Sequence, residues 1–179
     1  MRNVVLYQLL ALDGVAEEPG NWLFDGGDEL VANLGRVIER QDAVLLGRGT
    51  YDYWVDFWPT AEMEPFASFI NSTPKHVFTS SRPSTDWAAS TFVATPAVDY
   101  VTELKHQDGG DIGVHGSISL AQSLLAAGLV DELRLAVAPT VAGRGRRLFA
   151  SDAALQRFEL VEAGQTSSGV VLVGYTKRP

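Results

Sequence analysis

The chain has 179 residues, of which 46% are hydrophobic and 20% charged, and it contains no cysteine. Its 22 acidic residues outnumber the 14 basic ones and give a formal net charge of −8 at pH 7, which argues against nucleic-acid or membrane-surface binding, because both need a basic face. Without cysteine, disulfides and thiolate chemistry are excluded, and we expect a cytoplasmic protein that forms a single domain over residues 1–179.

The predicted elements alternate between strands and helices along most of the chain. A near-continuous apolar run at 4–12 predicts a first strand covered on both faces. It meets Asp13 and Gly14 too soon to span a membrane. Apolar residues at helical spacing predict helices at 29–40, 62–71, 96–106 and 117–127. The other β-prone segments are 43–47, 75–81, 90–94, 111–115, 131–141, 157–166 and 169–177.

This alternation predicts an α/β protein in which a mainly parallel sheet lies between two helix layers. The tail differs, because no long helix separates the last two strands, and Ser167, Ser168 and Gly169 fit a hairpin turn. We therefore expect a three-layer α/β/α fold with a mixed, eight-stranded sheet that ends in an antiparallel hairpin.

Two strand-to-helix junctions carry the residues that a phosphate group needs. In VLLGRGTYDYW, a strand ends at Gly47 and a helix is expected near Thr50; in DIGVHGSISL, the next helix is expected near Ser117. Glycine has no Cβ, so a diphosphate can approach the backbone closely at Gly47, Gly49 and Gly116, and helix N-termini attract anions. The alternative is that each glycine only makes a tight turn.

A third junction points to a particular phosphate. The segment VFTSSRP ends a strand with Thr79, Ser80, Ser81 and Arg82, and Arg48 directly follows the preceding strand. Arginines and serines together suit the 2′-phosphate of an adenosine ribose, because guanidinium groups bind phosphate through paired, charge-assisted hydrogen bonds. The alternative is that Arg82 is solvated and the serines cap a turn.

The order of these motifs resembles the dihydrofolate-reductase-like superfamily, and most closely a standalone form of its riboflavin-biosynthesis reductase branch. The most specific segments are LLGRGTY and HGSISLAQSLLAAGLVDEL, and the similarity spans essentially the whole chain. The resemblance implies an NADPH cofactor whose diphosphate lies at the two glycine-containing junctions, whose 2′-phosphate lies at the Ser-Ser-Arg segment, and whose nicotinamide borders the Asp-Gly after the first strand. Carried over residue by residue, the cofactor-binding residues are Asp13, Gly14, Gly47, Arg48, Thr50, Ser80, Ser81, Arg82, His115, Gly116, Ser117 and Ile118.

The same resemblance implies an NADPH-dependent oxidoreductase. Its substrate would be a small heterocyclic or carbonyl/imine molecule, such as a pyrimidine or pteridine, as for the 5-amino-6-(5-phosphoribosylamino)uracil reductases. It also implies a homodimer. The alternative is a non-catalytic nucleotide-binding protein that retains the cofactor cleft. The chain departs from dihydrofolate reductases at His115, where they have a glycine, and it lacks the deaminase domain and cysteine zinc ligands of many riboflavin reductases, so no metal is expected.

Candidates for the substrate side are fewer. Folate reduction uses a buried carboxylate at the start of the first helix, where this chain has Asp25, Asp28 and Glu29. Asp28 is our choice for a catalytic residue, although acids at a helix N-terminus also simply favour the helix dipole. Trp22 and Trp58 are candidates for a wall that stacks a heteroaromatic substrate, with core packing as the alternative.

One dense basic cluster, AGRGRRLF at 142–149, remains. Its arginines would suit a substrate phosphate, but a solvated loop is the interpretation that we favour.

Overall fold

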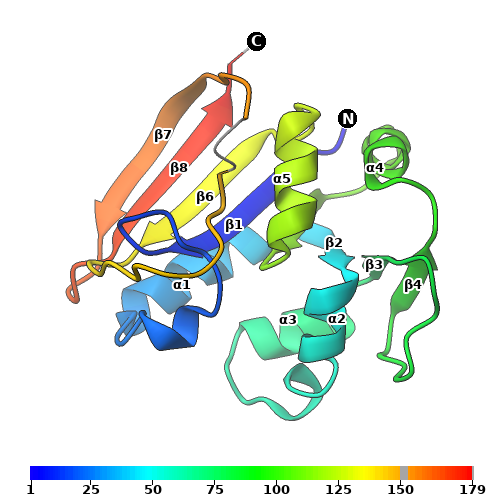
Figure 1. Ribbon diagram of the computed structural model, residues 1–179, viewed down its shortest axis with the longest axis horizontal. Coiled ribbons are helices and arrows are strands. Elements are labelled where there is room, and N and C mark those ends of the chain that lie inside the picture. The colour runs from blue at the N-terminus through cyan, green and yellow to red at the C-terminus, as the bar shows by residue number, and fades with distance from the viewer. Residues whose placement is uncertain (150–152, 179) are drawn as a thin grey trace.

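One eight-stranded sheet organises the molecule, in the strand order β4-β3-β2-β5-β1-β6-β8-β7 (Figure 1). The computed structural model describes residues 1–149 and 153–178. Strand β8 pairs antiparallel with both β6 and β7, and the other neighbours pair in parallel. All eight predicted strands are present: β1 (Val4–Leu10), β2 (Gln41–Gly47), β3 (Lys75–Phe78), β4 (Ser90–Val93), β5 (Asp111–His115), β6 (Glu132–Val137), β7 (Phe158–Gln165) and β8 (Val171–Lys177).

The predicted hairpin joins β7 to β8 at one end of the strand order. The Thr166 amide donates to the Val170 carbonyl at 2.9 Å, and the Gly169 amide donates to the Thr166 carbonyl at 3.0 Å. Gly169 has a φ of 85°, a left-handed conformation that glycine adopts without a steric penalty. The antiparallel end of the sheet is therefore confirmed.

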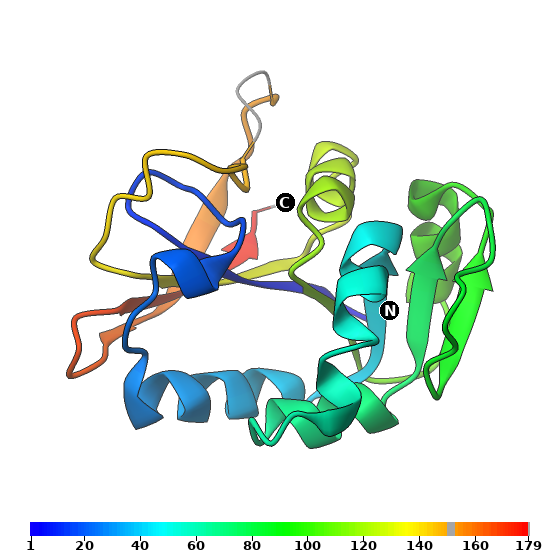
Figure 2. The ribbon, with the colours of Figure 1, turned by 60° about the horizontal axis from the view of Figure 1, so that its bottom comes forward.

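Helices pack on both faces of the sheet, as the alternation predicts. One core cluster joins β1 and β5 to the inner faces of α4 and α5, and another joins β2 and β3 to α2 and α3. Figure 2 shows α1 and α3 on one side of the sheet and α5 on the other. The helices are α1 (Gly27–Ile38), α2 (Arg48–Trp54), α3 (Phe66–Ser72), α4 (Ala97–Lys105) and α5 (Ile118–Ala126), with 3₁₀ turns at Pro19–Asn21 and Trp58–Thr60.

Two helix starts differ from the sequence prediction. The helix expected near Thr50 begins at Arg48, with Gly47 at its N-cap, so the strand passes into the helix without an intervening loop. The helix expected from residue 62 begins only at Phe66, directly after Pro65. Proline has no amide hydrogen, and it is tolerated at the start of a helix, where that hydrogen would have no partner.

A buried lysine fixes the end of α3. Lys75 has no exposed surface, and its Nζ donates to the carbonyls of Ile70 at 2.7 Å and Thr73 at 2.9 Å. The ammonium group also lies 4.6 Å from the centre of the Trp87 ring. These contacts use the last carbonyls of the helix, which otherwise lack partners.

No helix in the described part of the chain is long and apolar enough to span a membrane.

No helix formed by the described residues lies over the face of β7 and β8 opposite α1 (Figure 1). The strand register places Leu160 opposite Tyr175 on this face, and Ala163 opposite Val173. Leu160 is 53% exposed although it lies in the middle of a strand. Uncovered apolar sheet faces and unpaired edge strands favour association.

We predict that the protein is a dimer that associates through this face. The substitution Leu160→Lys places a charge on it and should shift the sedimentation coefficient to that of a monomer. The matched control is Val31→Lys, which adds the same charge at an exposed position of α1 and should leave the dimer intact. A wild-type protein that sediments as a clean monomer at micromolar concentration would contradict this prediction.

Candidate functional site

The two glycine-containing junctions form one site. Strands β2 and β5 are parallel neighbours, so α2 and α5 both begin at the same edge of the sheet. The Gly47 amide donates to the Ser117 hydroxyl at 2.9 Å, and these residues are the N-caps of α2 and α5. The hydroxyl of Ser117 makes no capping bond to its own helix. It connects the two junctions instead.

The junctions leave backbone accessible to an anion. The first amides of α5 have no carbonyl partner within the helix, and they carry the positive end of its dipole. Gly116 is exposed, with a φ of 71°. A Cβ at Gly49 would have no heavy atom within 4 Å, so a ligand can approach that turn freely. These features fit a diphosphate, which small residues and unpaired amides recognise at helix N-termini.

Arg48 links this site to the end of β3. Its Nη1 donates to the Ser81 carbonyl at 2.9 Å and the Ser81 hydroxyl at 3.1 Å, and it lies 3.3 Å from the Thr79 hydroxyl. Its Nε donates to both carboxylate oxygens of Asp52, at 2.8 and 2.7 Å. The structure thus brings three predicted groups together, and it adds Asp52, which the sequence analysis missed. The Arg48–Asp52 spacing of four residues on one helix is a signal that could have found it.

The remaining residues of the Ser-Ser-Arg segment lie outside this cluster. The Ser80 side chain is exposed. Arg82 is also exposed, and its Nη2 donates to both carboxylate oxygens of Asp86 at 3.1 Å. Its guanidinium lies 5.9 Å from the centre of the Phe92 ring on β4. Arg82 therefore sits at the outer edge of the sheet, whereas Ser81 contacts Arg48. Thr50 and Ile118 lie in the first turns of α2 and α5, and the Ile118 side chain is buried in the core.

An aromatic wall adjoins the junctions. A Cβ at Gly116 would lie 3.0 Å from the Trp54 ring. From Trp54 the rings continue edge to face, with centroid distances of 5.8 Å to Trp58 and then 4.8 Å from Trp58 to Phe66. The Asn71 amide donates to the Trp58 carbonyl at 2.8 Å, which fixes the backbone of this wall.

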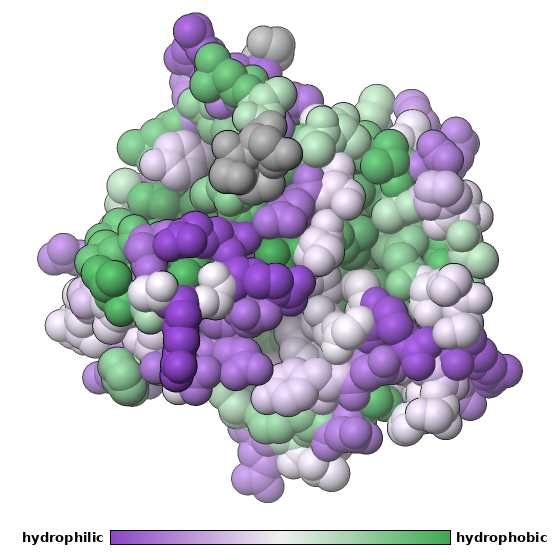
Figure 3. Space-filling view, viewed as in Figure 1, coloured by the Kyte–Doolittle hydropathy of each residue, from purple (hydrophilic) through white to green (hydrophobic). Residues whose placement is uncertain are grey.

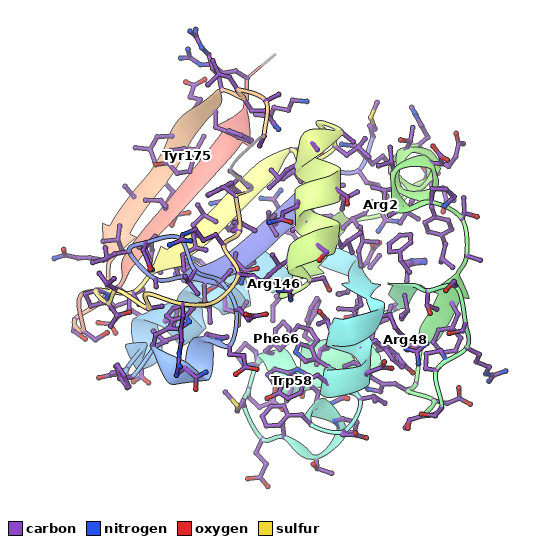
Figure 4. All side chains as sticks on the ribbon, viewed as in Figure 1. Arg2, Arg48, Trp58, Phe66, Arg146 and Tyr175 are labelled. Atoms are coloured by element: carbon purple, nitrogen blue, oxygen red, sulfur yellow. The ribbon has the colours of Figure 1, made fainter. Side chains whose placement is uncertain are left out.

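Trp58 faces a hollow in the surface. Figure 3 shows a depression at the centre of this side of the molecule, and in the same orientation Figure 4 places Arg146 on one side of it and Trp58 on the other, with Phe66 between them. The Trp58 Nε1 is buried and has no hydrogen-bond partner among the described residues. A buried donor without a partner is costly, but this nitrogen has almost no accessible surface, so a molecule in the hollow would contact the Trp58 ring and not its Nε1.

The His115 side chain is buried away from the two junctions at Gly47 and Ser117, which together we call the phosphate seat. It is 3% exposed, its Nε2 lies 2.8 Å from the Gln41 Oε1, and its ring packs 5.2 Å from that of Phe66. Burial lowers the pKa of His115 to about 3, because desolvation disfavours the charged imidazolium. The imidazole is therefore neutral near pH 7 and does not act as an acid there. Burial also raises the pKa of the neighbouring Tyr7 hydroxyl.

Asp13 and Gly14, which follow β1, hold their own loop against the loop at 142–148 by hydrogen bonds. The Asp13 carboxylate accepts hydrogen bonds from the amides of Gly143 at 2.9 Å and Ala142 at 3.3 Å. The Gly143 bond is the main cause that holds the pKa of Asp13 below its usual value. Gly14 has a φ of 80°, and its carbonyl accepts from the Leu148 amide. Asp13 is therefore ionised and organises the loop beside the hollow.

The basic loop at 142–149 is mostly exposed, and hydrogen bonds anchor two of its arginines. Arg146 donates from Nε to the Glu17 carboxylate at 2.7 Å, and from Nη1 to the hydroxyl of Ser119, in the first turn of α5, at 3.2 Å. Arg147 donates to the Asp13 carbonyl at 2.8 Å. The side chains of Arg146 and Arg147 are 58% and 56% exposed, as expected for a solvated loop, and groups of the 11–17 segment anchor both of them. Glu17 and Ser119 were not singled out by the sequence.

Two substrate-side candidates lie outside the wall. Asp28 is exposed at the start of α1, beside Glu29, whose carboxylate accepts from the Ser167 amide of the hairpin turn. This location does not provide the buried carboxylate that the folate reaction needs. The Trp22 ring is 4% exposed among Ala11, Val15 and Ala138, and its Nε1 donates to the Glu17 carbonyl. Trp22 therefore packs under the 11–25 loop.

The sequence and the fold of this chain are similar to those of known proteins. The family model of the RibD C-terminal domain matches residues 2–172. Uncharacterized protein YyaP of Bacillus subtilis (strain 168) is 29% identical over 97% of this chain and 94% of its own length. A putative riboflavin biosynthesis protein from Shewanella sp. PV-4 has the same fold, with a TM-score of 0.81 and 18% identity over 99% of each chain. A diaminohydroxyphosphoribosylaminopyrimidine deaminase/5-amino-6-(5-phosphoribosylamino)uracil reductase from Thermotoga maritima has a TM-score of 0.72 and 19% identity, over 99% of this chain and 57% of its own.

We predict that His115 makes stability depend on pH. Its pKa is depressed in the folded state, so between the ordinary value of 6.5 and about 3 only the unfolded chain binds the extra proton. The free energy of unfolding should then fall with falling pH by up to about 1.4 kcal/mol per pH unit from this residue alone. Urea unfolding of His115→Gln across this range should show a shallower slope than the wild type.

The control for this experiment is His106→Gln, which changes an exposed histidine just after α4. It should retain the wild-type slope. Equal slopes for the wild type and His115→Gln would show that the buried imidazole does not govern the pH dependence.

Proposed function

The chain belongs to the RibD C-terminal domain family, and we propose that it is an NADPH-dependent reductase that transfers a hydride to a small heterocyclic or carbonyl/imine acceptor. The observation that carries this proposal is the hydrogen bond between Gly47 and Ser117. It unites two strand-to-helix junctions into one seat beside an aromatic wall, which is the arrangement that a dinucleotide and a flat acceptor need.

The cofactor would be held by groups that fit its two kinds of phosphate. The free amides at the start of α5, with Gly116 and Gly47, suit the diphosphate. Arg48, supported by Ser81 and Thr79, suits the 2′-phosphate. When bound, NADPH supplies a hydride from its nicotinamide ring. The protein's contribution is to orient that ring and to keep the acceptor against it.

The acceptor would stack on the wall of Trp54, Trp58 and Phe66. A flat ring matches these aromatic faces. A pyrimidine or a pteridine is such a ring. Arg146, anchored by Glu17 and Ser119, closes the opposite side of the hollow and favours an acceptor with a polar or anionic substituent.

The proton that accompanies the hydride would come from water. His115 is buried and neutral, and the Asp13 carboxylate is held in its ionised form by backbone amides. Neither group is a suitable general acid at neutral pH. Water in the open hollow reaches the acceptor directly, so the reaction does not need a side-chain acid.

A non-catalytic nucleotide-binding protein is the second candidate. It would use the same junctions for the nucleotide, and it needs no proton source, so the unsuitability of His115 and Asp13 as acids is compatible with it. Oxidation of NADPH, followed by its absorbance in the presence of pyrimidine, pteridine or quinone acceptors, separates the two candidates. Consumption of the cofactor supports the reductase; tight binding without consumption by any acceptor supports the second candidate.

We predict that Arg48→Ala weakens NADPH binding by about 1.5–3 kcal/mol, the loss of charge-assisted bonds to phosphate, and leaves NADH binding nearly unchanged. Fluorescence titration of both cofactors measures the difference. Arg82→Ala should have a smaller effect, because Arg82 lies at the outer edge of the sheet. Arg36→Ala, an exposed change on α1, is the control. Equal losses for NADPH and NADH would mean that Arg48 does not contact the 2′-phosphate.

We also predict that the protein is a poor dihydrofolate reductase. Folate reduction needs a buried carboxylate to hold the protonated ring, and Asp28 is exposed. Steady-state turnover of dihydrofolate with NADPH should fall far below about 1 per second, the low end of ordinary enzymes. Asp28→Asn should leave any reductase activity unchanged. Robust turnover that Asp28→Asn abolishes would overturn this prediction.

A further inference from the structure

Arg48 and Arg82, the two arginines near the proposed 2′-phosphate site, are each paired with an aspartate carboxylate. Arg48 donates to both oxygens of Asp52, and Arg82 donates to both oxygens of Asp86. In each pair the acid follows the arginine by four residues. At the end of the sheet that would receive an anionic phosphate, the positive charge of each of these two arginines is therefore balanced by a carboxylate.

The Arg48 pair matters more, because this arginine lies inside the site. Its Nη1 is used by Ser81 and Thr79, and its Nε faces the Asp52 carboxylate. A carboxylate and a phosphate bind guanidinium in the same way, through oxygens in the plane of the donors. A 2′-phosphate that approaches Arg48 therefore meets a group that already occupies part of its donor edge and has the same sign of charge.

We propose that Asp52 is a specificity-determining residue, which limits the preference for NADPH over NADH by competing with the 2′-phosphate for Arg48. This inference rests on the proposed function. NADH has a hydroxyl in place of the 2′-phosphate, so its binding does not require Arg48 to exchange partners. The carboxylate thus acts on one cofactor and leaves the other unaffected.

The exposure of the pair sets the size of the effect. The Arg48 side chain is 34% exposed and that of Asp52 is 48% exposed, so water and salt screen their interaction. Exposed ion pairs shift an equilibrium by roughly two- to fivefold. Repulsion between the carboxylate and the phosphate dianion adds to this effect. We therefore expect that removal of the Asp52 charge tightens NADPH binding by about three- to tenfold.

The test is calorimetric titration of NADPH and NADH into Asp52→Asn and the wild type. The substitution keeps the shape of the side chain and removes its charge. NADPH should bind about three- to tenfold more tightly to the variant, NADH should bind equally well to both proteins, and the gain should shrink in high salt.

Two further variants serve as controls. Asp56→Asn makes the same change of charge at an exposed residue just beyond α2, and it should bind both cofactors as the wild type does. Asp52→Glu keeps a carboxylate that can still reach Arg48, and it should restore the wild-type preference. Thermal unfolding of each variant verifies that it is folded, and Asp52→Ser provides the same loss of charge if the asparagine variant is not.

The outcomes separate this inference from the function on which it rests. If the wild type binds NADPH but loss of the Asp52 charge leaves NADPH affinity unchanged or weaker, the inference is wrong and the cofactor assignment stands. Equal tightening of NADPH and NADH also overturns the inference, because it cannot arise at the 2′-phosphate. If the wild type binds neither cofactor, both the proposed function and the inference are refuted.

Discussion

The parallel pairing of β2 with β5 is the constraint on which the rest of the site depends. Neighbouring parallel strands end at the same edge of a sheet, so the helices that follow them begin side by side. Here the register sets Leu45 opposite Val114, close to the ends of both strands, and the Gly47 amide reaches the Ser117 hydroxyl. A sheet with other strands between these two would separate the junctions, and neither turn alone would make a two-sided seat.

The face of the sheet that carries α1 and α3 supports the aromatic wall. Several buried polar groups of this layer have specific partners, although the Trp58 Nε1 and the Gln41 Nε2 have none among the described residues. The His115–Gln41 pair lies over Gly113, where a Cβ would collide with both side chains. Lys75 and Asn71 satisfy carbonyls at the end of α3 and before it. Buried polar groups without such partners would destabilise the fold. The same contacts keep Trp58 and Phe66 at fixed positions beside the phosphate seat, so the stability of this layer and the shape of the hollow have a common origin.

Much of the fold could be predicted from the sequence, because apolar periodicity and glycine-rich turns are local signals. All eight strands and the closing hairpin were predicted in this way. The junctions at Gly47 and Ser117 were found for the same reason. What the sequence could not provide are contacts between distant segments. The hydrogen bonds from the Gly143 amide to Asp13 and from Arg146 to Glu17 each join residues about 130 positions apart. No local sequence pattern indicates such contacts. Asp28 illustrates the same limit: its position in the sequence fits a catalytic acid, but its exposure depends on how α1 packs in the folded chain.

The central claim is that the two junctions together receive the diphosphate of a dinucleotide. It is tested most directly by following the backbone amide resonances of the protein while NADPH is added. We predict that the largest shifts occur together at Gly47, Gly49, Gly116 and Ser117, with the same midpoint. Residues at the opposite end of the sheet, such as Asp111 and Glu132, should not shift. Shifts at only one of the two junctions, or shifts confined to the far end of the sheet, would contradict it.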